Sequence, residues 1–233
     1  MHIRAAIFDV FGTVVDWRTG VATVLQRAFA AKGIIHDAHA FADDWRGQYQ
    51  PAMERIRSGV RGYVPLDDLH RENLDIVLNE RGLDDVFNAE ERDGINHAWE
   101  QLPPWPDSFH GLTFIRNHMP IAPCSNGSIA LMTALARFGG LPWDCILGAE
   151  IAQGYKPDPK VYQVSCAALR LPAADVVMVA AHNDDLAAAR AAGLRTAFIS
   201  RPDEKGPGLG EVTAAADWDF VADDLQALAP MLA

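Results

Sequence analysis

Short apolar runs alternate with helical patterns throughout the second half of the chain, and this alternation constrains the fold more than any other feature. Apolar runs at 119–126, 175–185 and 194–200 predict strands that are buried on both faces. Helical patterns separate them, and the one before the last run ends at Gly193. Strands joined through helices form a parallel sheet with helices on both faces. The sequence therefore predicts an α/β protein with a mostly parallel, Rossmann-like sheet.

One further apolar run, at 3–8, comes before a long stretch without a strand pattern. Residues 17–101 have the texture of charged helices, and the proline-rich segment 102–108, "LPPWPDS", then indicates a hinge or linker. We therefore expect a core domain made of residues 1–16 and 102–233, with residues 17–101 inserted as a helical domain directly after the first strand.

The composition excludes several classes of protein. The 233 residues contain 20 Lys and Arg against 31 Asp and Glu, a formal net charge of -11, which repels nucleic acid and anionic membranes. No apolar stretch approaches the roughly 18 residues of a membrane span. Cys124, Cys145 and Cys166 form no C-x-x-C pair and are odd in number, which suits a reducing compartment. We expect a cytoplasmic protein with no nucleic-acid or membrane partner.

Polar residues end several of the predicted strands. Asp9 follows the first strand, Ser125 and Asn126 end the second, and His182 and Asp185 follow a later one. In a parallel sheet with helices on both faces, ligands bind at the carboxyl ends of the strands. These side chains are therefore expected to converge on one site.

Asp9 is the central residue of that site. A carboxylate held among backbone N–H groups stays ionised, and it can then act as a nucleophile and form a covalent ester. Thr13, one turn later, can hold it by a hydrogen bond, and Lys156 of the loop "YKPDP" would supply a neutralising positive charge. The alternatives are that Asp9 only caps the Gly-Thr turn and that Lys156 is a solvated loop lysine.

Ordinary structural explanations also exist for the other polar residues. Ser125 or Ser128 would serve as the N-cap of the next helix. Asp184 and Asp185 open a predicted helix, where the helix dipole favours acids.

Four segments, in chain order, carry a resemblance to a known superfamily. They are "FDVFGTVVD" at 8–16, "CSNGS" at 124–128, "YKPDPKVY" at 155–162 and "AAHNDDLAAAR" at 180–190. They resemble the four motifs of the haloacid dehalogenase superfamily, and the helical insert resembles that superfamily's cap domain. The resemblance covers nearly the whole chain and implies a Rossmann-like core with an inserted helical cap.

Phe11 distinguishes two activities within that superfamily. Its phosphatases have an acid two places after the nucleophile, whereas here the position is Phe11, which cannot transfer a proton. A halide leaves as a stable anion and needs no proton. With Trp45 and Arg46 in the insert, the sequence resembles the (S)-2-haloacid dehalogenase branch. The resemblance implies hydrolysis of short (S)-2-haloalkanoic acids to (R)-2-hydroxyacids through an Asp9 ester, without cofactor or metal. It also leads us to expect a homodimer.

The resemblance also implies roles for individual residues. Asp9 would attack C2 of the substrate, held by Thr13, and Arg46 and Asn126 would stabilise the departing halide. The substrate carboxylate would be held by Ser125 and by backbone amides after Asp9. Lys156 would neutralise charge around Asp9, supported by Tyr162, and Val10 and Phe11 would contact the substrate. Asp185 would activate the water that hydrolyses the ester.

His182 departs from the pattern of close relatives, which commonly have "SSN" before the final Asp, whereas this chain has "AAHN", with Ala180 and His182 at those places. It is either a structural residue or a donor to the halide or the hydrolytic water. We hypothesise that it narrows the halide site and favours small halides, including the fluoride of fluoroacetate. Arg46 has an alternative explanation as well, a surface ion pair within "DDWRGQ". Two alternatives stay open for Trp45, Tyr49 and Phe11: they line an apolar pocket that suits a halogen, or they belong to the core, as aromatic residues more often do.

Two other functions stay open at this point. One is a Mg²⁺-dependent phosphate-ester hydrolase, in which Asp184 and Asp185 would hold the metal together with Asp9 and the carbonyl of Val10. The other is a non-catalytic protein that only binds a small anion.

Overall fold

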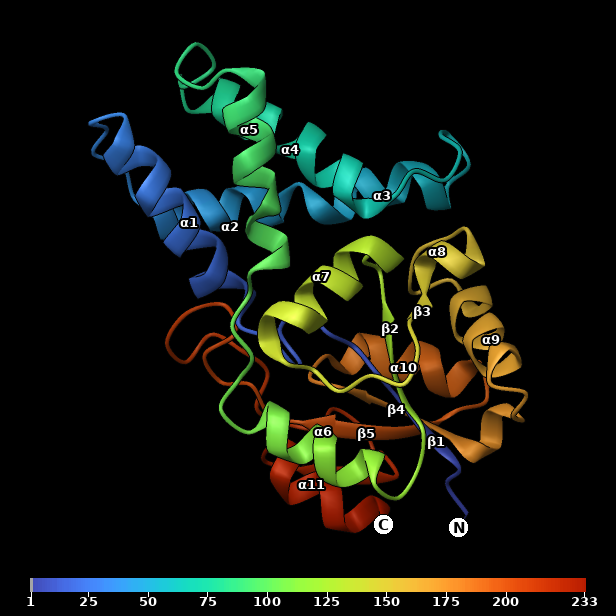
Figure 1. Cartoon of the computed structure of the whole chain (residues 1–233). Helices are drawn as coiled ribbons and strands as arrows, with labels where there is room; N and C mark the ends of the chain where they lie inside the picture. The colour runs from blue at the N-terminus through green and yellow to red at the C-terminus, as the bar shows by residue number, and fades with distance from the viewer. Residues whose placement is uncertain (1) are drawn as a thin grey trace.

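The predicted apolar runs form the strands of one parallel sheet in the computed structural model, which describes residues 2–233 (Figure 1). The sheet has six strands in the order β3-β2-β1-β4-β5-β6. Their bounds are β1 Ala5–Phe8, β2 Ile121–Ser125, β3 Leu147–Gly148, β4 Val176–Ala180, β5 Arg195–Ile199 and β6 Phe220–Ala222. Because β1 pairs with both β2 and β4, the residue after β1 lies at the centre of the sheet's carboxyl edge.

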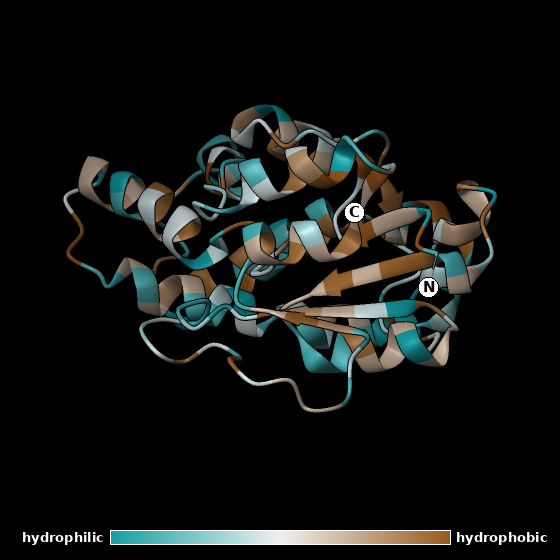
Figure 2. Cartoon of the chain, turned by 90° about the horizontal axis from the view of Figure 1, so that it is seen from below, coloured by the Kyte–Doolittle hydropathy of each residue, from teal (hydrophilic) through white to brown (hydrophobic). Residues whose placement is uncertain are grey.

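Alternate residues of the strands pack against helices on opposite faces of the sheet. Ala6 and Phe8 belong to the core on one face, and Ala5 and Ile7 to the core on the other. The first face is covered by α6 Ser108–Arg116, α7 Ile129–Gly139 and α11 Leu225–Leu232, and the second by α9 Pro159–Ala168 and α10 Asn183–Ala191. Figure 2 shows the hydrophobic strands enclosed between these helices. The predicted α/β class is therefore confirmed.

Residues 17–101 are helical, as the sequence predicts. They form α1 Trp17–Ala31, α2 Ala38–Gly47, α3 Tyr49–Arg57, α4 Leu66–Glu80, α5 Ala89–Asn96 and a 3-10 turn at His97–Glu100, and they contain no strand. Figure 1 shows α1 to α5 gathered together at one end of the molecule. The division into a core and a cap domain at these boundaries stays a prediction.

The linker 102–108 is bonded along much of its length to the chain that leaves β1. The Asp16 amide donates to the Pro103 carbonyl at 2.9 Å, and the Trp105 amide donates to the Val14 carbonyl at 3.0 Å. The Trp105 indole donates to the Gly12 carbonyl at 2.9 Å. The two connections to the helical insert thus brace each other next to Asp9.

Strand β3 is very short. Only Leu147–Gly148 pairs with β2, and α8 Ala149–Ala152 begins immediately afterwards. Gly148 has a φ of 110°, and a Cβ atom there would lie 2.2 Å from the Ser125 carbonyl oxygen. Glycine is required at this close approach, and its left-handed backbone ends the strand. Among residues 2–233, no helix is long and apolar enough to span a membrane.

Candidate active site

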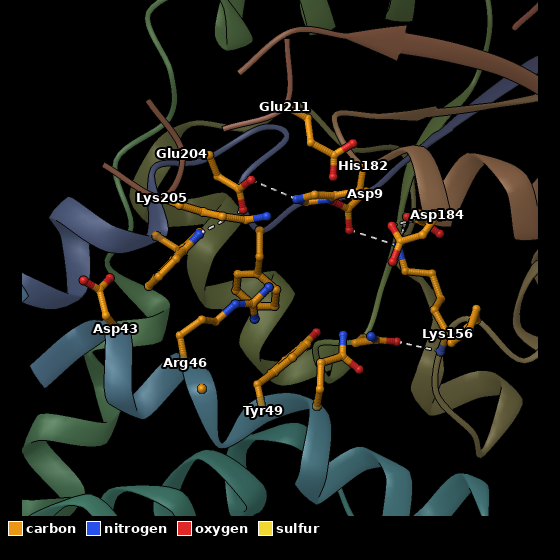
Figure 3. Close-up of a pocket in the computed structure, with 17 residues that line it drawn as sticks. Asp9, Asp43, Arg46, Tyr49, Lys156, His182, Asp184, Glu204, Lys205 and Glu211 are labelled. Carbon is orange, nitrogen blue, oxygen red and sulfur yellow. Dashed lines mark hydrogen bonds and ion pairs between the residues drawn. The ribbon is translucent and has the colours of Figure 1, made fainter. Parts of the chain in front are cut away.

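A cavity of about 520 Å³ opens at the carboxyl ends of β1, β2 and β4, and residues of α2 and α3 line its other side (Figure 3). Asp9, Asn126 and His182 reach it from the strand ends, while Arg46 and Tyr49 reach it from the helical insert. The sequence-based expectation that the motif residues converge on one edge of the sheet is correct.

Asp9 is a buried carboxylate with donors on both oxygens. Thr13 Oγ1 donates to Oδ2 at 2.7 Å, Lys156 Nζ donates to Oδ1 at 2.9 Å, and His182 Nδ1 lies 3.0 Å from Oδ2. Burial alone would raise the pKa of Asp9, but the Lys156 ammonium and the His182 ring hold that pKa well below its ordinary value. Asp9 is therefore ionised across the neutral range.

Lys156 joins two carboxylates. Its ammonium group also bonds to Asp185 Oδ2, and the Tyr162 hydroxyl donates to Asp185 Oδ1. Burial raises the pKa of Asp185, and the nearby Asp9 carboxylate adds to this effect, although Lys156 opposes it. Burial would lower the pKa of Lys156, but Asp185 and Asp9 hold it well above the ordinary value. Lys156 is thus a buried cation and not a solvated loop lysine.

The residues of the "CSNGS" segment divide into structural and pocket-lining ones. Ser128 is the N-cap of α7, and Ser125 Oγ accepts a hydrogen bond from the Gly127 amide at 3.1 Å. Asn126 lines the cavity, and its Oδ1 accepts from the Lys156 backbone amide at 2.8 Å, which fixes the loop that carries the lysine. Ser125 and Val10 are fully buried and do not line the cavity.

Arg46 is held by aromatic rings and not by an ion pair. Its guanidinium carbon lies 3.8 Å from the ring centroid of Tyr49, 5.4 Å from that of Trp17 and 5.8 Å from that of Phe11. Its Nη1 is buried without a hydrogen-bond partner in the described chain. The surface ion-pair explanation is therefore wrong, and an unpaired guanidinium beside the cavity is suited to bind an anion.

Trp45, the neighbour of Arg46, does not line the cavity, and of the two alternatives for it the core is correct. Its indole nitrogen donates to the His70 carbonyl at 2.8 Å inside the helical insert. Consecutive helical residues point about 100° apart, and here Arg46 turns toward the cavity while Trp45 turns into the core of the insert. Phe11 and Tyr49 line the cavity.

His182 contacts a second carboxylate that the sequence analysis missed. Its Nε2 lies 3.0 Å from Oε2 of Glu204, and the Trp17 indole donates to Oε1 of Glu204 at 3.1 Å. Glu204 is only 2% exposed. It comes from the Gly- and Pro-rich segment "RPDEKGPGLGE", in which no sequence signal separates it from solvated charges. Lys205 and Glu211 of the same segment also line the cavity and were missed for the same reason.

The carboxylates of the site do not fit a magnesium ion. Asp9 and Asp185 face each other across the Lys156 ammonium, and His182 takes up the other oxygen of Asp9. Asp184 accepts a hydrogen bond from the Asp185 amide at 2.8 Å. Within residues 2–233, no group of three or more His, Cys, Asp or Glu side chains has a metal-binding arrangement. A divalent cation at Asp9 would be repelled by the lysine that already neutralises it.

Comparison with known proteins shows the family of this chain. A family model described as haloacid dehalogenase-like hydrolase matches residues 3–193. The structure of the defluorinating L-2-haloacid dehalogenase Rha0230 is 48% identical, covers 99% of this chain and 95% of its own, and has a TM-score of 0.97. The L-2-haloacid dehalogenase PA0810 is 44% identical with a TM-score of 0.95, and covers 99% of this chain and 98% of its own. The (S)-2-haloacid dehalogenase of Pseudomonas sp. strain YL is 29% identical over 226 residues, which is 95% of this chain and 91% of that relative. This chain belongs to the haloacid dehalogenase-like hydrolases, in the L-2-haloacid dehalogenase branch.

Proposed function

We propose that this protein hydrolyses short (S)-2-haloalkanoic acids to (R)-2-hydroxyacids through a covalent ester on Asp9. One observation carries the proposal: an ionised, buried Asp9 faces a cavity in which the position two residues later is Phe11. A nucleophile without a proton donor at that position suits a leaving group that departs as an anion. The similarity to L-2-haloacid dehalogenases supports this reading.

In the first step, an oxygen of Asp9 attacks C2 of the substrate from the face opposite the halogen. The carbon–halogen bond breaks, and the halide leaves with the electron pair. Arg46, Asn126 and His182 line the cavity and supply N–H donors to the developing anion. The substrate carboxylate is held by the backbone amides that follow Asp9, and not by Ser125, which is fully buried and does not line the cavity.

In the second step, water attacks the carbonyl carbon of the Asp9 ester. Asp185 orients or deprotonates this water, while Tyr162 and Lys156 fix its carboxylate. The raised pKa of Asp185 brings this base closer to the operating pH, which favours proton transfer from water. Only one displacement occurs at C2, so the configuration there is inverted.

Small halides, including the fluoride of fluoroacetate, are part of the proposal. The His182 ring lies against Asp9 and lines the cavity, and we propose that it narrows the halide site. The similar protein Rha0230 is described as defluorinating. We expect His182→Asn to change the ratio of the chloride and fluoride release rates, and an unchanged ratio would refute the role of His182 in halide selection.

The decisive experiment is a single turnover of (S)-2-chloropropionate with excess enzyme and EDTA, in water enriched in the heavy oxygen isotope. We expect chloride release, lactate with ordinary oxygen in the first turnover, and heavy oxygen in the Asp9 carboxylate. The function is refuted if no chloride appears and a phosphate ester is cleaved once Mg²⁺ is restored.

Location and assembly complete the proposal. The cysteines are free, and burial raises the pKa of the Cys124 thiol to about 12, so this thiol is not a competing nucleophile. A cytoplasmic location, a homodimeric assembly and the absence of a nucleic-acid partner stay predictions.

A further inference from the structure

His182 bridges two carboxylates that belong to different parts of the chain. Its Nδ1 lies 3.0 Å from Asp9 Oδ2 and its Nε2 lies 3.0 Å from Glu204 Oε2 (Figure 3). An ionised carboxylate only accepts hydrogen bonds, so both contacts require a proton on each ring nitrogen. The geometry therefore describes an imidazolium between two anions.

Glu204 is fixed in place by the core and by the first helix of the insert. The Trp17 indole donates to its second oxygen, and its side chain lies where a Cβ atom on Gly12 would be, with Oε1 only 2.2 Å from that position. Arg201, three residues earlier, donates to the Thr13 carbonyl at 2.8 Å and to both oxygens of Asp107 at 2.9 and 2.7 Å. The segment is thus anchored to the same turn that carries the nucleophile.

The other charges around His182 lie further round the cavity. They are the cations Lys156, Arg46 and Lys205 and the anions Asp43, Asp184, Asp185 and Glu211. Lys156 bonds to Asp9 and Asp185, and Glu211 bonds to the amide of Asn183 at 3.0 Å. Of the described charged groups, Asp9 and Glu204 are the two that contact the ring directly.

We infer that Glu204 is a positioning residue that keeps His182 a cation aimed at the reacting centre, so that the ring stabilises the departing halide as negative charge moves onto it. This inference rests on the proposed function. As the bond from Asp9 to C2 forms and the carbon–halogen bond breaks, negative charge moves from the carboxylate to the halogen. The ester oxygen is the weaker acceptor, and the halide becomes the stronger one. The electron pair leaves with the halide and no proton is transferred.

If the charged ring stabilises the departing halide, the effect of its charge on the rate of halide release depends on which halide leaves. Fluoride is the poorest leaving group of the series and the strongest hydrogen-bond acceptor, so its release depends most on a charged donor. Glu204→Gln keeps an acceptor for Nε2 but removes the charge that stabilises the imidazolium. Asp203→Asn is the matched control, because it makes the same change of charge one residue away, on an exposed side chain whose oxygen accepts from the Gly208 amide.

The test combines nitrogen NMR of the His182 ring, assigned by its loss in His182→Asn, with single-turnover release of fluoride, chloride and bromide from the haloacetates. We expect two protonated ring nitrogens at neutral pH in the native protein and in Asp203→Asn. Glu204→Gln should lose one of these protons near neutrality and release fluoride about tenfold more slowly or worse, with smaller losses for chloride and bromide. The alkaline limb of its rate profile should move down by about one pH unit.

A singly protonated ring in the native protein at neutral pH would overturn the inference. Equal losses for all three halides with an unchanged pH profile would also overturn it, since they indicate a purely structural glutamate. If the native protein releases no halide at all, the proposed function is refuted, and so is the role of His182 in stabilising the departing halide. The NMR result then still decides whether Glu204 fixes the charge of the ring.

Discussion

Replacement of Lys156 by Met tests the electrostatic basis of the site most directly. Lys156 is 7% exposed, and its ammonium bonds to Asp9 and Asp185, which are each 8% exposed. Methionine keeps most of the length and the apolar contacts of the lysine stem and removes only the charge. Removal of one partner from a buried ion pair costs about 3–5 kcal/mol, because the other charge is left unpaired.

The same substitution should also change how the free energy of unfolding depends on pH. In the native protein the lowered pKa of Asp9 contributes stability above the unfolded pKa of about 3.9 and loses it as the pH falls through the folded pKa. The raised pKa of Lys156 contributes stability below the unfolded pKa of about 10.4 and loses it as the pH rises through the folded pKa. The contribution of these groups is therefore complete across the neutral range.

Without the ammonium, two buried carboxylates share one site and together retain a proton, so the pKa of the pair rises above that of the unfolded chain. Such a pair stabilises less as the pH rises. We therefore expect Lys156→Met to lose more stability between pH 5 and pH 8 than the native protein, in which Lys156 opposes the rise in the pKa of Asp185. Halide release should fall by at least about 10²-fold, because the nucleophile is partly protonated.

Urea unfolding at both pH values, together with single-turnover halide release, measures these effects. Lys160→Met is the matched control, since it removes the charge of an exposed lysine four residues away. The reasoning is refuted if Lys156→Met unfolds with a free energy within about 1 kcal/mol of the native value at both pH values.

Three further substitutions test other contacts. Arg46→Lys keeps the charge but loses the planar group that stacks on Tyr49, so kcat/KM should fall about 10²-fold while exposed Arg55→Lys changes little; equal values would exclude the guanidinium as the anion-binding group. Arg201→Met leaves Asp107 buried and unpaired and should cost about 3–5 kcal/mol in urea unfolding, a loss that Arg201→Met with Asp107→Leu should largely recover. Gly12→Ala adds a methyl group where Glu204 lies, at a φ of 87°, and should lower the unfolding free energy by about 1–3 kcal/mol; an unchanged value would mean that the segment yields freely.

The edge of the sheet was the part of the site that the sequence could predict. Asp9, Asn126 and His182 each follow an apolar run, and in a parallel sheet such positions must lie close together. Lys156 lies outside any strand, and the motif resemblance suggested its place, which the 2.9 Å contact with Asp9 confirms. Local patterns therefore sufficed for residues that directly follow a predicted strand.

Residues that reach the cavity through long-range contacts could not be predicted in this way. Glu204 lies in an irregular segment, and its position depends on the space left by Gly12 and on the bond between Arg201 and Asp107, residues 94 positions apart in the chain. Trp45 and Arg46 show the limit of a two-residue motif, because a helix turns its neighbours to different faces. Which face of a short helix points toward the cavity is decided by tertiary packing, and the local sequence does not predict that packing.

The site offers cations to its substrate, although the chain as a whole is negatively charged. A protein with a formal charge of -11 repels a haloacid from its surface, so its affinity for an anion has to come from short-range contacts. These contacts come from three buried or partly buried cations, each stabilised in a different way. Two carboxylates stabilise Lys156, aromatic rings stabilise Arg46, and the buried Glu204 stabilises His182. Acidic residues thus serve the anion site indirectly, because a buried cation persists only where a carboxylate or an aromatic face compensates for the lost water.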